Sequence, residues 1–421
     1  VKLPLRARRT KARSCRVSMA CSMNAIHTSI EKHCALFLAK FWHVARLMLI
    51  CRGMQKLSTV QKSTLAGVVQ PVRIGFIPLV DCAPLLVARK MDLFRKHGVH
   101  VELSCEVGWA TIREKLLYGQ LDAVHAIAGL ALAMRLGISG PPCRVVAPFV
   151  FNLHGNAITL SKDLWNRGVR DAASLKKLIR SAFSRRFTFG MVSRYSSHNF
   201  LLRQWLQAGG IDVEKDVRIV ALPPTQMASS LAAGLIDGYC VGEPWNSYAV
   251  EQGIGWIAAT SEQLAPGHPE KVLLTTERFV SAHTGESQAI INALKEACEF
   301  CDAKENRPEV VRILADSGYF SGSEKILKRS LVGPLDLGFD KSVAVTDFHI
   351  FHRRDANLPV SERGRWLLDQ FIAHGLLTSS QYTDAATALH EAWTAELQFP
   401  KAKAAARTPA KSNKRSKLVQ A

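Results

Sequence analysis

The chain has 421 residues, 48% of them hydrophobic and 21% charged, which is the balance of a globular protein with room for two separate cores. Its formal net charge of +20 is concentrated at the ends: residues 1–70 carry 13 Lys and Arg against one acid, residues 401–421 carry seven against none, and the span between them is close to neutral. No aromatic or groove-reading motif accompanies the basic ends, so direct nucleic-acid binding is not expected.

The first 70 residues predict a basic, disordered extension. Their most apolar stretch, residues 35–51, is interrupted by Lys40, His43 and Arg46. The uninterrupted apolar run over residues 47–50 is too short for a signal-peptide core or a membrane span. We therefore expect a cytoplasmic protein, with a periplasmic or membrane-associated location as the alternative.

Regular structure is expected to begin at Val72. Alternating and continuous apolar runs predict strands over 72–77, 99–103 and 121–127, and helices lie between them over 83–94 and 110–118. This β-α-β-α-β order at ~25-residue spacing predicts a parallel sheet with helices on its faces.

The following segment repeats this plan. Strands are expected over 144–151, 156–160, 186–191, 218–222 and 236–240, and helices over 175–184, 198–208 and 226–233. Gly119-Gln-Leu-Asp-Ala123 and Gly234-Leu-Ile-Asp-Gly238 stand at matching places before a buried strand. The sequence therefore predicts an α/β protein of two doubly wound lobes with a central ligand cleft. The expected divisions are a basic extension (1–70), lobe 1 (71–155), lobe 2 (156–270), the rest of lobe 1 with a helical C-terminal region (271–398), and a basic disordered tail (399–421).

Beyond residue 275 the pattern is mainly helical, over 286–301, 308–317, 323–331 and 362–374. The single CxxC, Cys298-Glu-Phe-Cys301, lies inside a helical pattern and has no second pair of ligands. His349 and His352 are spaced as helical neighbours, but no third ligand is evident, so packing is the favoured role. Neither a metal nor a cofactor is expected.

Catalytic motifs of the GxSxG, P-loop, HExxH and GxGxxG types are absent from the sequence, which favours a binding protein over an enzyme. Polar residues at strand ends are the candidate site, because ligands of doubly wound sheets bind there. Trp109 could donate its indole N–H to an anion, or serve only as a core residue. His154-Gly155-Asn156 could bind the ligand where the chain crosses between lobes, or form a hinge turn alone.

Three further positions complete the candidate site. Pro224 opens a helix whose backbone N–H groups could face an anion. Glu243 follows a strand of the second lobe, although a carboxylate would repel an anion unless paired. Lys271 would supply the positive charge that a buried monovalent anion requires, with a solvated surface lysine as the alternative.

Seven segments, in this order and spacing, resemble the nitrate/bicarbonate substrate-binding family of ABC transporters over roughly residues 71–375. They are residues 72–84, 108–113, 155–158, 203–210, 242–245, 268–271 (His-Pro-Glu-Lys) and 306–310. The resemblance implies a type II periplasmic-binding-protein fold with nitrate or nitrite between its lobes. It places the ligand contacts of nitrate-binding members on Trp109, His154 and Lys271.

The chain departs from the transporter members at two ligand positions. They carry glutamine where His154 stands and a histidine near the position of Met191, whereas the nearest histidine here is His198. Ser196-Ser-His-Asn199 and the segment from His154 to Ile158 look closer to the cytoplasmic nitrate-sensor branch. That branch sequesters an RNA-binding antiterminator protein until the anion arrives.

Three functions therefore remain open. The first is a nitrate/nitrite sensor acting through an antiterminator, and the second is the substrate-binding component of an ABC permease. The third is an enzyme similar to thiamine-pyrimidine synthases, which share this architecture; the chain shows no Cys-rich iron segment of the kind they need.

Overall fold

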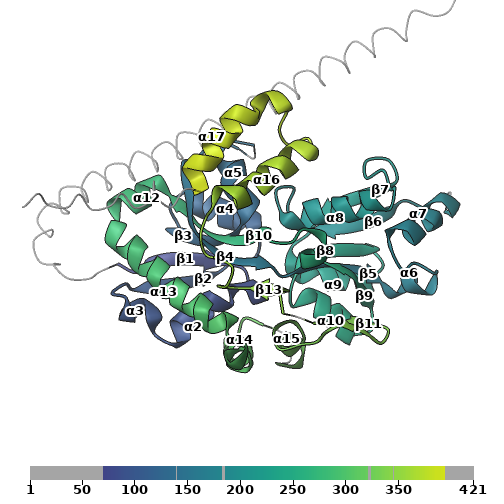
Figure 1. Cartoon of the computed structure of the whole chain (residues 1–421), viewed down its shortest axis with the longest axis horizontal. Helices are drawn as coiled ribbons and strands as arrows, with labels where there is room; N and C mark the ends of the chain where they lie inside the picture. The colour runs from purple at the N-terminus through teal and green to yellow at the C-terminus, as the bar shows by residue number, and fades with distance from the viewer. Residues whose placement is uncertain (1–69, 139, 183–184, 321–323, 345, 394–421) are drawn as a thin grey trace, which may run out of the picture. The chain divides into compact units, whose positions relative to one another are not determined.

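The computed structural model describes residues 70–393, apart from 139, 183–184, 321–323 and 345 (Figure 1). The basic segments expected over 1–70 and 399–421 lie outside the described residues, except for Gln70. No helix within the described range is long and apolar enough to cross a membrane.

The first sheet has six strands, in the order β13-β4-β10-β3-β1-β2. β1 pairs in parallel with both β2 and β3, which confirms the predicted β-α-β-α-β run. β10 runs antiparallel to β3 and β4, so this sheet is mixed. The strands are β1 (Val72–Phe76), β2 (Val101–Cys105), β3 (Ala123–Ile127), β4 (Val145–His154), β10 (Pro269–Thr276) and β13 (His349–Ile350). The helices connecting its first strands are η1 (Val80–Cys82), α2 (Ala83–Lys90), α3 (Leu93–Lys96), α4 (Trp109–Leu117) and α5 (Ala128–Arg135).

The second sheet has five strands, in the order β7-β6-β8-β5-β9. They are β5 (Asn156–Ser161), β6 (Phe187–Met191), β7 (Val217–Ala221), β8 (Gly238–Gly242) and β9 (Gly255–Thr260). The accompanying helices are α6 (Lys162–Asn166), α7 (Ala172–Ser181), α8 (Ser197–Ala208), α9 (Pro224–Ala232), α10 (Trp245–Glu251) and α11 (Ser261–Leu264). β6 lies parallel to β7 and β8, which repeats the β2-β1-β3 arrangement of the first sheet.

The repeated Gly-x-Leu/Ile-Asp segment has a structural explanation. Asp122 accepts a hydrogen bond from the Arg73 backbone N–H at 2.9 Å, and Asp237 accepts one from the Thr188 N–H at 2.8 Å. Each aspartate thereby ties the start of β3 or β8 to the neighbouring parallel strand. The duplicated sequence thus marks equivalent strand pairs in the two sheets.

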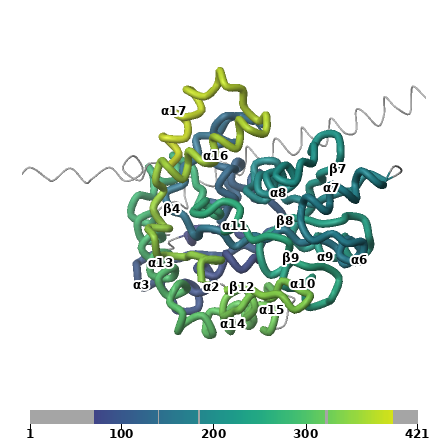
Figure 2. The backbone as a smooth tube through the Cα atoms, turned by 45° about the vertical axis from the view of Figure 1, so that its right-hand side comes forward, coloured from purple at the N-terminus to yellow at the C-terminus, as the bar shows by residue number. Residues whose placement is uncertain are grey.

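The remaining elements are α12 (Glu277–Ala282), α13 (Thr284–Asp302), η2 (Lys304–Asn306), α14 (Arg307–Asp316), α15 (Glu324–Leu331), β11 (Leu335–Gly338), β12 (Lys341–Val343), α16 (Ser361–Ala373), η3 (Ser379–Gln381) and α17 (Tyr382–Trp393). α15 packs against α14 and α10, and β11 packs against β9, so this late part of the chain returns to the five-stranded sheet. α16 and α17, drawn in yellow, run beside one another (Figure 2), and α17 contacts β4 and α5.

The helical spacing predicted for His349 and His352 is wrong. His349 lies in β13, which pairs antiparallel with β4, and His352 follows in a bend. Cys298 and Cys301 lie in α13 as expected, and both are buried. The predicted strands do not include β9 and β10, although β10 is central to the six-stranded sheet and carries Lys271.

Candidate functional site

The chain crosses between the two sheets at His154 and Gly155. His154 ends β4 with φ +64°, and Gly155 has φ +96°. A Cβ atom on Gly155 would lie 2.4 Å from Cε1 of His349, so only glycine fits this crossing. The chain returns through residues 261–268, between β9 and β10. Buried side chains with polar atoms gather beside these two crossings. The Lys271 group comprises Asp81, Trp109, His125, Asn156, Ser197, His198, His268, Glu270 and Lys271.

Lys271 lies at the centre of this group and has no exposed surface. Its Nζ donates to Oδ2 of Asp81 and to Oε1 of Glu270, both at 2.7 Å. Burial alone would lower the lysine pKa, but these two carboxylates outweigh it and raise the pKa above its usual value. Lys271 is therefore a buried cation and not a solvated surface lysine, and its charge already faces two carboxylates.

Glu270 accepts hydrogen bonds from elements of both sheets. Asn156 Nδ2 donates to its Oε2 at 2.5 Å, and the Ser197 hydroxyl donates to the same oxygen. Nε2 of His198 lies 3.3 Å from Oε1, and Nε2 of His268 lies 3.5 Å from Oε2. Burial opposes the charge of Glu270, but Lys271 and these histidines hold its pKa well below the usual range.

Asp81 has fewer partners than Glu270, although both contact the same ammonium. Its Oδ1 has no hydrogen-bond partner and lies 3.4 Å from Nε2 of His125. Burial raises the pKa of Asp81 to about 6, and Lys271 offsets this only in part. Burial also holds the pKa of His125 well below its usual value. Asp81 is thus the carboxylate of the pair that takes up a proton more readily.

Trp109 is the first residue of α4 and lies against Lys271. The centroid of its ring system is 5.5 Å from Nζ of Lys271, a distance at which a cation is attracted to an aromatic face. Its indole N–H is buried and has no hydrogen-bond partner among the described residues. A buried donor without an acceptor is costly, so this N–H marks a place where a small acceptor would be stabilised.

Asn156 and His198 also belong to this polar group. Nε2 of His198 donates to Oδ1 of Asn156 at 2.8 Å, because an amide oxygen can only accept. Burial lowers the histidine pKa to about 3, so the ring is neutral. Ser197 and His198 are the first two residues of α8, whose N-terminus favours a nearby negative charge.

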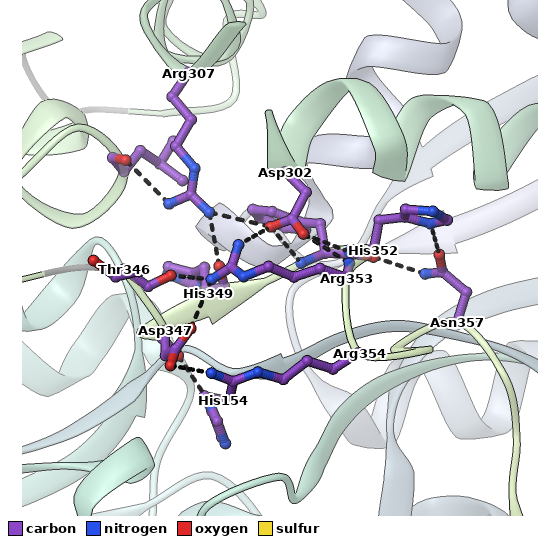
Figure 3. Close-up of polar contacts among 12 residues, drawn as sticks. His154, Asp302, Arg307, Thr346, Asp347, His349, His352, Arg353, Arg354 and Asn357 are labelled. Atoms are coloured by element: carbon purple, nitrogen blue, oxygen red, sulfur yellow. Dashed lines mark hydrogen bonds and ion pairs between the residues drawn. The ribbon is translucent and has the colours of Figure 1, made fainter. Parts of the chain in front are cut away.

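His154 makes its hydrogen bonds to the backbone, and its ring contacts His268 at 5.1 Å between ring centroids. Its Nδ1 donates to the backbone oxygen of Asp347 at 2.8 Å (Figure 3), and its Nε2 accepts from the Gly267 N–H at 2.6 Å. Burial lowers its pKa to about 4. The ring lines a separate cavity of about 370 Å³ together with Thr260 and Arg354. With both ring nitrogens bonded to the backbone, His154 positions the crossing and offers no hydrogen bond to the Lys271 group.

Within the part of the chain that the structure describes, the other predicted residues make no hydrogen bond to Lys271 or Glu270. Glu243 is buried, with one carboxylate oxygen accepting from the Ser247 N–H at 3.2 Å and the other without a partner. Burial raises its pKa to about 7. Pro224 is the buried first residue of α9, and Met191 is the buried last residue of β6.

Sequence reasoning missed Asp81, His125, Ser197, His268 and Glu270 as members of this group. Four of them were within reach, because they lie in segments that carry the family resemblance: Asp81 in 72–84, Ser197 in Ser196-Ser-His-Asn199, and His268 and Glu270 in 268–271. His125 gives no local signal, because it lies in the middle of a buried apolar strand. In the part of the chain that the structure describes, no three His, Cys, Asp or Glu residues are arranged to hold a metal ion.

A model of the NMT1-like family matches residues 66–315. The nitrate import ATP-binding protein NrtC of Synechocystis sp. is 40% identical over 307 residues, covering 72% of this chain and 46% of its own length. The chain therefore spans about half the length of such ATP-binding relatives. The nitrate/nitrite binding protein NrtA of Nostoc sp. is 30% identical over 322 residues, covering 72% of this chain and 71% of NrtA.

Among solved structures, the periplasmic nitrate-binding protein NrtA from Synechocystis PCC 6803 superimposes with a TM-score of 0.74 at 27% identity, covering 79% of this chain and 88% of that one. This match gives the two sheets the two-lobed, type II periplasmic-binding-protein fold that the resemblance implied. The chain belongs to the NMT1-like family and, within it, to the NrtA/CmpA type of substrate-binding proteins.

Proposed function

We propose that this chain is a non-catalytic binding protein that closes around nitrate or nitrite beside Lys271 and Trp109. One observation carries the proposal: the buried, unpartnered indole N–H of Trp109 lies next to a buried, cationic lysine. The NrtA relatives named above support the choice of anion. The lysine contributes charge, and the indole contributes a directed hydrogen bond.

Anion binding would be coupled to closure of the two lobes. Lobe 1 comprises the elements on the six-stranded sheet, and lobe 2 those on the five-stranded sheet. Trp109, Asp81 and Lys271 belong to lobe 1, while Asn156 and His198 belong to lobe 2. An anion that contacts both groups binds the closed state more tightly than an open one and shifts the population toward it.

We further propose that the closed protein delivers its anion to an ABC permease. Support comes from the nitrate import and bicarbonate transport ATP-binding proteins among its relatives, which match over about half of their length. This role would place the protein in the periplasm or at the membrane.

A cytoplasmic sensor is the second candidate. It is favoured by Ser196-Ser-His-Asn199 and by the segment from His154 to Ile158. Affinity isolation from cells with and without nitrate separates the two. An RNA-binding antiterminator that is released by nitrate would support the sensor, and association with a permease would support transport.

Calorimetric titration with nitrate, nitrite and bicarbonate tests anion binding directly. Trp109→Phe keeps an aromatic ring at this position but removes the indole N–H. We expect it to weaken nitrate or nitrite binding about tenfold. Lys271→Met should abolish binding. Trp165→Phe is the matched control, because Trp165 lies in α6, away from the group, where it stacks on Phe339. No heat with nitrate or nitrite would contradict the function, and full affinity in Trp109→Phe would contradict the site.

A further inference from the structure

The carboxylate of Glu270 is surrounded in the way a bound anion would be. Its Oε1 accepts from Lys271 Nζ at 2.7 Å and lies 3.3 Å from His198 Nε2. Its Oε2 accepts from Asn156 Nδ2 at 2.5 Å and from the Ser197 hydroxyl. These donors come from β10, β5 and the N-terminus of α8, so a single carboxylate joins both sheets.

The charges of the Lys271 group are unfavourable for an additional anion. Lys271 is its one lysine or arginine, and it already faces two carboxylates, Asp81 and Glu270. A monovalent anion placed against Lys271 would add a third negative charge to a site without exposed surface. Repulsion between negative charges at such short distances in a buried site costs several kcal/mol. One carboxylate must therefore move aside or lose its charge.

The shape of Glu270 identifies which carboxylate moves. A carboxylate is a planar monoanion with two oxygens on one central atom. Nitrite has the same form, and nitrate presents the same pair of oxygens along each edge. Donors arranged around a carboxylate therefore also suit these anions. Asp81 lacks such a setting, because among the described residues only Lys271 donates a hydrogen bond to its side chain, and Oδ1 accepts none.

We propose that Glu270 occupies the anion receptor of this protein as an internal stand-in, and that the bound oxyanion displaces it from Lys271, Asn156 and Ser197. The inference rests on the proposed function, because it concerns the same site. It makes Glu270 a determinant of affinity. The free energy of binding is the difference between the interaction of these donors with the anion and their interaction with Glu270.

Chemical rescue of Glu270→Ala tests the proposal. This variant leaves a carboxylate-sized space among unchanged donors. We expect formate and nitrite to raise its melting temperature in a saturable manner, and by more than they raise that of the wild type, while chloride does not. Asp81→Ala is the matched control, because it also removes a carboxylate from Lys271 but leaves Glu270 in place. Equal rescue of both variants, or no rescue of Glu270→Ala, would overturn the proposal.

Glu270→Gln provides a second test if the alanine variant does not fold. The amide has the same shape without the charge, so it competes less for Lys271, and we expect nitrite to bind about tenfold more tightly than to wild type. Unchanged or weaker binding would overturn the proposal. Rescue of Glu270→Ala by formate, together with a wild type that binds neither nitrate nor nitrite, would refute the proposed function but support the receptor. Nitrate binding by the wild type, without rescue of Glu270→Ala by formate or nitrite, would support the proposed function but refute the receptor.

Discussion

Glu243 illustrates how burial of a single side chain makes stability depend on pH. It lies at the end of β8, and its backbone oxygen accepts from the Val80 N–H at 2.8 Å, which links the two sheets. Its carboxylate has no cationic partner among the hydrogen bonds and ion pairs of the described residues, and burial raises its pKa from 4.5 to about 7. The folded state therefore holds this proton more tightly than the unfolded chain does.

Glu243→Gln is expected to remove this dependence. Because the folded pKa is raised, the contribution of Glu243 to stability is fully present below pH 4.5 and is lost as the pH rises through 7. Relative to wild type, the variant should gain up to about 3 kcal/mol between pH 4.5 and pH 8. Urea unfolding at both pH values measures the difference, with the exposed Glu305→Gln as control. A constant difference between variant and wild type would contradict the assignment.

The composition of the site could be predicted from the sequence only in part. Trp109, Asn156, His198 and Lys271 do meet, because strand ends and crossings are recognisable locally. The pairing of Lys271 with Asp81 joins positions 190 residues apart, and no local pattern records it. The resemblance and the place of His154 at the crossing predict a ligand contact, whereas its ring nitrogens bond to the backbone of Asp347 and Gly267.

Asp302, at the end of α13, shows how one side chain holds a whole element in place. Its carboxylate accepts from the backbone N–H groups of Phe351, His352 and Arg353, and from the guanidinium groups of Arg307 and Arg353 (Figure 3). This network fixes the segment that follows β13. β13 has two residues and pairs with His154 and Leu153 of β4, nearly 200 residues earlier, so its sequence could not predict a strand.

Asp302→Asn should loosen this segment. An amide replaces one acceptor oxygen with a donor that faces the guanidinium groups, and loss of the charge leaves Arg307 buried without its anionic partner. We expect a loss of about 2–4 kcal/mol in the free energy of unfolding. Denaturant titration measures it, with Asp316→Asn, exposed at the end of α14, as the control. If both variants unfold alike, Asp302 does not anchor the segment.

Across the described unit as a whole, the late part of the chain stabilises the five-stranded sheet. Leu335 of β11 is fully buried and shares a core cluster with Ala157 of β5 and Ile257 of β9. The helical pattern expected after residue 275 did not predict this return, because the hairpin of β11 and β12 is short and its apolar partners lie in another part of the sequence. The β-α-β periodicity did predict the parallel strands of both sheets, because strands and helices alternate there at short, regular spacing.

Leu335→Ala should therefore destabilise a sheet to which its own segment does not belong. We expect a loss of about 2–5 kcal/mol, as for other buried leucines. Faster hydrogen exchange of the β9 amides would show where the loss acts. Leu358→Ala, at a leucine that is 51% exposed, should have little effect. Unchanged exchange in β9 would show that the hairpin only covers the surface.

The complete burial of Lys271 and Glu270 also sets a limit on kinetics. A ligand that contacts Nζ of Lys271 has no route to water unless the two sheets first separate. Its rate of escape cannot exceed the rate of that opening, whichever anion is bound. With an excess of ligand, the observed association rate should likewise level off at the opening rate instead of rising in proportion to concentration. Residence time would then be a property of the hinge, whereas selectivity would be a property of the donors around Glu270.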